Sequence, residues 1–188
     1  NFDPNRFAQL PAARLNASFE MQGQLKPSPT LFGRFQLRDS RLGDQPLLGH
    51  GEIDLSGDHL RKANIDLAAA GNRLTAQGAF GKPGDRLVLR IAAPRLAPFG
   101  LAGDVDGQLV LSGSVQSPEI DANLRSTRLA ASQVGEIHGL ELLVRLGAGE
   151  QGVLAGNLRL ETLAGAKGEV LLQNVRLTAD GSRSRHRV

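Results

Sequence analysis

The stretch Leu15-Asn16-Ala17-Ser18-Phe19-Glu20-Met21-Gln22 alternates apolar and polar side chains without a break. Successive side chains of a β-strand point to opposite faces of its sheet, so a period of two is typical of a strand with one buried and one solvated face. A helix would place its apolar residues three and four positions apart. The stretch therefore predicts a strand that is apolar on one face and polar on the other.

The same alternation recurs along the rest of the chain, in runs around Phe35, Ile53, Leu67, Ala76, Leu89, Leu109, Leu124, Leu142, Leu158 and Leu177. Stretches such as Gly43-Asp44-Gln45-Pro46, Gly71-Asn72 and Asp180-Gly181 separate these runs and are typical of tight turns. Connections this short favour antiparallel neighbours, because parallel strands need long crossovers. We expect on the order of a dozen strands of about 5 to 9 residues in an all-β, mostly antiparallel sheet.

The composition is that of a folded protein with an unusual choice of apolar residues. The chain has 188 residues, 40% of them hydrophobic and 22% charged, which is enough for one domain and too apolar for intrinsic disorder. Aromatic residues make up 4% and both Trp and Tyr are absent, whereas Gly occurs 23 times. A core without large rings must consist of thin aliphatic layers.

Charge and cysteine content exclude several classes of function. The formal net charge is +3, with basic and acidic residues interspersed, so no nucleic-acid patch is expected. The absence of Cys excludes disulfides and thiolate metal sites. No apolar run approaches the roughly 20 residues of a membrane-spanning helix. Because the chain starts at Asn1 and not at a methionine, we expect residues 1–188 to be a single β-rich domain excised from a longer protein.

Glycine placement bears on the shape of the sheet. Several glycines share the parity of neighbouring large apolar residues, namely Gly23, Gly33, Gly51, Gly78, Gly107, Gly113 and Gly156. Glycine inside a strand marks bulges, close backbone approach or curvature, so the sheet is expected to curl strongly. Two interpretations remain open: a small closed barrel or sandwich, or a curled sheet that leaves an apolar trough open. One short helix is also possible near the start, capped by Asp3, beginning at Pro4 and stopped by Pro11.

No arrangement of residues indicates an enzyme, a cofactor site or a metal site. Gly147-Ala148-Gly149-Glu150-Gln151-Gly152 matches a dinucleotide fingerprint but precedes a strand pattern, so a hairpin loop is expected. Asp104-Val105-Asp106-Gly107 lacks the further oxygen ligands of a calcium loop, and its two Asp are expected on the wet face. The histidines are scattered, and no serine has an evident base or nucleophile elbow.

Three stretches resemble the TamB family of AsmA-like periplasmic proteins, and the likeness extends over nearly the whole chain. They are Phe2-Asp3-Pro4-Asn5-Arg6-Phe7, the segment Asn72-Arg73-Leu74-Thr75-Ala76-Gln77-Gly78, and Gly107-Gln108-Leu109-Val110-Leu111-Ser112-Gly113 with Ser117-Pro118-Glu119-Ile120 after it. The end at Leu177-Thr178-Ala179-Asp180-Gly181 is also similar. The chain is identified in this way with the C-terminal periplasmic part of a TamB-like protein.

The resemblance implies a long curled sheet, open as a tube or trough with an apolar concave face, in the periplasm of a Gram-negative bacterium and anchored in the inner membrane. It implies a bridge that shields phospholipid acyl chains on their way to the outer membrane, a role in assembling outer-membrane proteins, and a TamA-like outer-membrane barrel as partner. It carries over no catalytic residue.

The expected groove residues are large, share one parity along their strands and have no aromatic partners to fill a closed core: Phe19, Met21, Ile53, Leu55, Leu67, Leu89, Leu109, Leu111, Leu142 and Leu158. Gln108 and Val110 are expected on the opposite, wet face. Two hypotheses of different class remain. The apolar face is either a conduit for acyl chains or unfolded outer-membrane protein strands, or part of a rigid structural β-solenoid or adhesin-like spacer with a filled core.

Overall fold

The computed structural model describes residues 13–26, 29–131, 135–182 and 184–187. Over these residues the chain forms one sheet of 14 strands, and every strand pair in it is antiparallel. The predicted all-β, antiparallel fold is therefore confirmed. The short helix expected between Asp3 and Pro11 lies outside the described residues.

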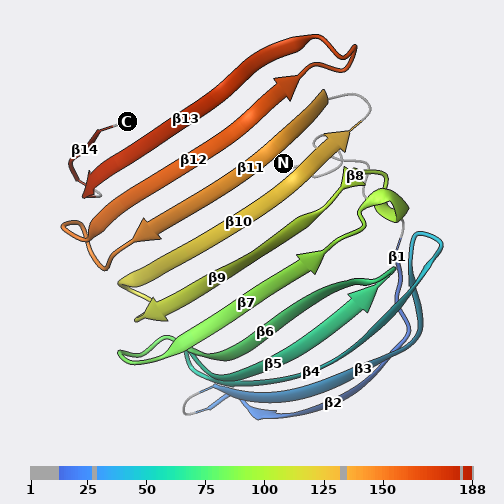
Figure 1. The fold of residues 1–188 in the computed structure, drawn as a ribbon. Coiled ribbons are helices and arrows are strands. Elements are labelled where there is room, and N and C mark those ends of the chain that lie inside the picture. The colour runs from blue at the N-terminus through green and yellow to red at the C-terminus, as the bar shows by residue number, and fades with distance from the viewer. Residues whose placement is uncertain (1–12, 27–28, 132–134, 183, 188) are drawn as a thin grey trace, which may run out of the picture.

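The strands follow one another along the sheet as a meander, with β9 to β13 as a broad layer and β2 to β5 bending round at the other end (Figure 1). Their bounds are β1 (Ala13–Arg14), β2 (Ala17–Gln24), β3 (Thr30–Leu42), β4 (Gln45–Ser56), β5 (His59–Ala69), β6 (Asn72–Phe80), β7 (Arg86–Ala93), β8 (Ala102–Gly103), β9 (Val105–Gly113), β10 (Pro118–Ala131), β11 (Gly135–Leu146), β12 (Val153–Ala164), β13 (Val170–Ser182) and β14 (His186–Arg187).

Tight turns join most neighbouring strands, as the sequence predicted, but the turn expected at Asp180-Gly181 was wrong, because both residues lie within β13 and pair with β12. Between β5 and β6 the two turn residues, Ala70 and Gly71, have φ of 53° and 83°. Positive φ at both central residues is the requirement of the type I′ hairpin, whose twist matches that of the strands. The longest excursion separates β7 from β9; it contains a short 3-10 helix, η2 (Ala97–Phe99), and β8, which pairs with β10.

The strands are longer than expected. We predicted about 5 to 9 residues, but β3 has 13 and β10 has 14. Bulges explain part of the difference, because they let a strand continue past a break in the alternation. In β3 the register shifts between Leu37 and Ser40, where Asp39 has a φ of 52°.

The sheet is a single open layer. Its edge strands do not pair with each other in the sheet order, so the closed barrel considered from the sequence is not the fold of the described chain. Among these residues no large side chain is fully buried, and the buried apolar ones are Ala63, Leu87, Ala93 and Val110. Side chains are therefore covered mainly by their neighbours within the sheet.

Glycines of β3 and β4 give room to large neighbours on the same face. A Cβ added at Gly51 would overlap the ring of Phe35, which lies directly opposite in β3. At Gly33 an added Cβ would meet only ordinary contacts, with Met21 Cγ at 3.8 Å. Phe35 thus covers bare backbone at Gly51, and its ring also approaches that of Phe19, with 6.5 Å between the centroids.

This contrast predicts opposite effects of the same substitution at two glycines. Gly51→Ala should lower the free energy of unfolding by about 1–3 kcal/mol, because Phe35 must leave its position. Gly33→Ala, the matched control, should leave it unchanged or raise it by up to about 1 kcal/mol, since the unfolded chain loses freedom and nothing clashes. Chemical denaturation of both variants measures the difference, and equal effects would contradict the role given to Phe35.

Candidate functional site

The candidate site is the face of the sheet on which the large aliphatic side chains lie. Residues directly opposite each other in antiparallel strands project to the same face. In the centre of the sheet Leu89 lies opposite Leu109, and Leu111 opposite both Leu87 and Ile120. Further along, Leu142 lies opposite Leu158. These strands therefore present most of their leucines on one side, whereas Leu143 of β11 lies opposite Asn157 on the other side and is 53% exposed.

The register extends this face to the N-terminal strands. Leu74 of β6 lies opposite Leu67 of β5 and Ile91 of β7, which links the two halves of the sheet. Ile53 lies opposite Gly33, which in turn lies opposite Met21. All the predicted groove residues consequently share one face, from β2 to β12. We call it the aliphatic face. That lipid contacts it stays a prediction.

The same face holds apolar residues that the sequence analysis did not select: Leu31, Leu37, Leu74, Leu87, Ile91, Leu124, Val144, Leu160 and Leu177. Their parity was already visible in the alternation, so the signal that finds them was present in the sequence. Their inclusion makes the aliphatic face continuous from strand to strand as far as β13.

Exposure varies across the aliphatic face. Phe19, Met21 and Leu177, near the two ends of the sheet, are 69%, 67% and 51% exposed. Leu87, in the middle, is only 9% exposed, and the central predicted residues such as Leu109 are half-buried. Contiguous exposed apolar surface is typical of sites that contact another molecule, which makes this face the candidate site.

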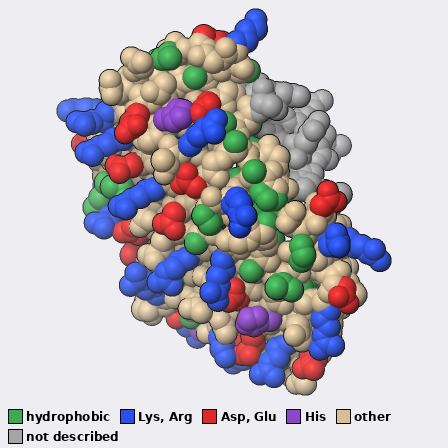
Figure 2. Space-filling model, turned by 45° about the vertical axis from the view of Figure 1, so that its right-hand side comes forward, with side chains coloured by type: hydrophobic (Ala, Val, Ile, Leu, Met, Phe, Trp, Pro, Cys, Tyr) green, Lys and Arg blue, Asp and Glu red, His purple; other side chains and the backbone are tan. Residues whose placement is uncertain are grey.

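The opposite face, here called the polar face, is crossed by ion pairs between neighbouring strands. Glu52 of β4 accepts from Arg34 Nε at 3.1 Å and from Lys62 Nζ at 2.7 Å. Arg145 Nη2 lies 3.0 Å from Asp121 Oδ2. Basic and acidic side chains are interspersed over the molecular surface in Figure 2. Like the aliphatic face, this one follows from the register.

Neighbouring charges alter the pKa of several carboxyl groups on the polar face. The hydrogen bond from Lys62, helped by Arg34, holds the pKa of Glu52 below its ordinary value. Arg73 Nε donates to Asp66 Oδ1 at 2.9 Å and lowers the pKa of Asp66 in the same way. Both carboxylates stabilise the folded sheet while they are charged.

One residue departs from the expected pattern. Val110 was expected to be solvated on the wet face, but its side chain is only 7% exposed. It lies mid-sheet between Val88 and Asp121, where neighbours on both sides cover a short side chain. Val110 therefore lies on the polar face, as predicted, but the expectation that it is solvated there was wrong. Gln108 lies on the same face and accepts from Arg90 Nε at 3.1 Å.

The remaining candidate motifs have structural roles. Gly147 to Gly152 form the hairpin connection between β11 and β12, as predicted. The carboxylate of Asp104 accepts the backbone N–H groups of Thr127 and Arg128, which satisfies an irregular point of β10. Within the described ranges, no group of three or more His, Asp or Glu is placed to hold a metal ion, and no helix is long and apolar enough to cross a membrane.

The fold and its two faces define a class of protein: an open, single-layer antiparallel sheet with one aliphatic and one charged face. The family model described as TamB, N-terminal domain, matches residues 3–188, and the chain belongs to the TamB family. No curated protein and no solved structure matches it.

The match corrects one part of the sequence interpretation. We placed the chain in the C-terminal part of a TamB-like protein, whereas the matching model is that of the N-terminal domain. The stretches that carried the resemblance consist mainly of Leu, Gly and Asp at strand spacing. Because such strands can recur along a long sheet, they identify the family better than the position within it.

The lowered pKa of Glu52 predicts how acid affects stability. A folded-state pKa below the unfolded value means that the stabilisation is present above about pH 4.5 and is lost as pH falls through the folded-state pKa. Glu52→Gln should therefore be less stable than the unchanged protein at pH 7. Denaturation curves at pH 7 and at about pH 2.5 measure this, and a difference that persists in acid would contradict an ionic origin.

Proposed function

We propose that the aliphatic face shields phospholipid acyl chains while lipid crosses the periplasm between the inner and outer membranes. The observation that carries the proposal is the series of aliphatic side chains, spaced by glycines, that lies on one face from β2 to β13, with Phe19 and Met21 at one end and Leu177 near the other. Each methylene removed from water contributes about 0.8 kcal/mol, so even partial cover of an acyl chain is a sizeable driving force.

The chemistry of the face suits a ligand without polar recognition groups. Its side chains are Leu, Ile, Val and Ala with few rings, and the charges that we described project from the other side. Such a surface offers dispersion and water exclusion without fixed hydrogen-bond positions. An acyl chain, which has no polar atoms and many conformers, matches these properties.

The proposal includes a stronger curl of the sheet into a trough or tube with the aliphatic face inside. Close approach of Phe35 to Gly51 and the bulges in β3 and β5 support this, because glycines and bulges are the usual means of bending a sheet. A curled sheet would cover more of each acyl chain than a flat one.

Membership of the TamB family supports the wider setting. In it the chain is a non-enzymatic, periplasmic part of an inner-membrane-anchored protein, acts in the translocation and assembly module, and works with a TamA-like barrel in the outer membrane. Residues 1–188 then form one β-rich unit of that longer protein.

A second occupant, an unfolded strand of an outer-membrane protein, is favoured by the edge of β13. Within the described chain β14 pairs only with Asp180 and Gly181 on that edge. Val170 and Leu171 are each 55% exposed farther along β13. Unpaired backbone groups beside exposed apolar side chains can accept an added strand. The filled-core spacer is less favoured, since no large described side chain is fully buried.

Photo-crosslinking should separate the two faces. A crosslinking side chain at Leu89 or Leu109 is expected to capture phospholipid in the bacterial envelope, because both lie on the aliphatic face. The matched positions Val88 and Gln108, one residue away on the polar face, should capture little. Mass spectrometry of the purified adducts identifies the lipid. Equal labelling of both faces would refute shielding by the aliphatic face.

A charge should distinguish a conduit from a spacer. Leu109→Asp places a carboxylate among acyl chains, where an unpaired charge costs several kcal/mol, so less lipid should co-purify in native mass spectrometry. Gln108→Asp is the control, because Arg90 opposite it supplies a partner. Both variants should keep their circular-dichroism spectra. Global unfolding of Leu109→Asp and Leu111→Asp alike would favour a filled core instead.

A further inference from the structure

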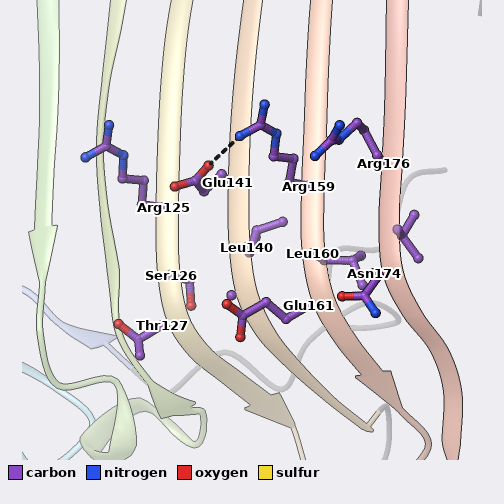
Figure 3. Close-up of a pocket in the computed structure, with 12 residues that line it drawn as sticks. Arg125, Ser126, Thr127, Leu140, Glu141, Arg159, Leu160, Glu161, Asn174 and Arg176 are labelled. Atoms are coloured by element: carbon purple, nitrogen blue, oxygen red, sulfur yellow. Dashed lines mark ion pairs between the residues drawn. The ribbon is translucent and has the colours of Figure 1, made fainter.

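A hollow of about 750 Å³ crosses β10 to β13 where these strands bend. In Figure 3 three arginines, Arg125, Arg159 and Arg176, stand in one row along its edge. Thr127, Glu161 and Asn174 form a second row below them. The volume falls within the range of small-ligand sites and exceeds that of a single ion.

The register makes the arginine row a consequence of strand pairing. Glu141 of β11 lies opposite both Arg125 of β10 and Arg159 of β12. Arg159 lies opposite Arg176 of β13. Like charges directly opposite each other destabilise a sheet unless something neutralises them.

The arginines of this row have little or no neutralising contact. Arg159 Nη1 lies 4.0 Å from Glu141 Oε2, the longest ion pair among the described residues. Arg125 and Arg176 make no side-chain hydrogen bond or ion pair within the described ranges. Elsewhere on the polar face Arg34 and Arg145 are bonded to carboxylates at 3.1 and 3.0 Å. The guanidinium N–H groups at the hollow can therefore still donate hydrogen bonds to a ligand.

Glu161, the acid of the second row, lies against the backbone of β11 at Gly139. Gly139 has a φ of 62°, and a Cβ at this position would lie 2.9 Å from Glu161 Oε2. The absence of a side chain at Gly139 lets Glu161 lie across β11, as Figure 3 shows. The lining then carries three cationic and two anionic side chains, a net charge of one positive unit.

From these observations we infer that the hollow binds a phosphate group through Arg125, Arg159 and Arg176. Guanidinium groups present paired N–H donors that match phosphate oxygens, and such charge-assisted bonds are among the strongest in proteins. Thr127 and Asn174 add neutral donors at the opposite wall. Among the described side chains Arg159 has only the 4.0 Å contact with Glu141 and Arg176 has no ion pair, so a bound phosphate would neutralise these two opposed arginines.

The inference goes beyond the proposed function. The arginine row lies on the polar face, because Arg159 neighbours Leu158 of the aliphatic face along β12. Phosphate binding at the hollow therefore requires no acyl chain on the other side of the sheet. The phosphate has two possible sources: a phospholipid headgroup or free phosphate.

Isothermal titration calorimetry of the 188-residue protein with inorganic phosphate and with glycerophosphoglycerol tests the inference. Tighter binding of glycerophosphoglycerol identifies the headgroup as the source, and equal or tighter binding of inorganic phosphate identifies the free ion. Both results support a phosphate site. The absence of binding heat with either probe at millimolar concentrations would overturn the phosphate site. Lipid capture at Leu109 could still succeed in that case, so failure of the phosphate site is distinct from failure of the shielding function.

Variants assign the binding to the hollow. Arg159→Gln and Arg176→Gln should each weaken binding by about tenfold, whereas Arg90→Gln, elsewhere on the polar face, should not change it. Glu161→Gln should strengthen binding by about threefold because it removes a repelling charge. Equal losses in Arg90→Gln and Arg176→Gln would overturn the assignment. If the arginine variants have no melting transition, they are unfolded and Glu161→Gln alone decides. Phosphate binding to Glu161→Gln that is no tighter than to the unchanged protein would then overturn the assignment.

Discussion

Each strand of this sheet is held to the next by backbone hydrogen bonds in a fixed register, and a slip of one residue would exchange the two faces of that strand. The pairs Leu67–Leu74, Leu74–Ile91 and Leu89–Leu109 fix the aliphatic side in the middle of the sheet. On the other side Arg73 meets Asp66 across the same strands. Because both faces depend on one register, any change that shifts a strand would alter them together.

Bulges keep this register consistent along strands that are longer than the alternation alone allows. Leu60 and Ile65 of β5 have opposite parity, yet both lie on the aliphatic face. The extra residue at Arg61–Lys62 restores the phase between them. In β3 the shift between Leu37 and Ser40 acts in the same way. The long strands therefore remain apolar on one side from end to end.

The same bulges limit what the sequence could predict. Alternation and turn residues were sufficient for the all-β class, the antiparallel order and the common face of Phe19 to Leu158. Strand lengths were underestimated, because the alternation of apolar and polar residues breaks before Ser40 in β3 and after Leu60 in β5. In the sequence such a break resembles the end of a strand. The row of Arg125, Arg159 and Arg176 also escaped notice, since these residues come together only through the register of three successive hairpins, which alternation does not define. The burial of Val110 depends on register too, because Val88 and Asp121 lie opposite it.

A single-layer sheet has no second sheet to pack against, so contacts between its own strands must select the correct strand register. The polar face supplies part of it, because Glu52 links three strands through Arg34 and Lys62, and Asp121 links two through Arg145. Exposed ion pairs add little stability one by one, but wrong registers would bring like charges together. The shapes of the side chains on the aliphatic face therefore contribute less to the choice of register. Leucine, valine and isoleucine can exchange there at small cost, so the surface can stay smooth and unselective. Such a surface fits a ligand that is recognised by its apolar character and not by its shape.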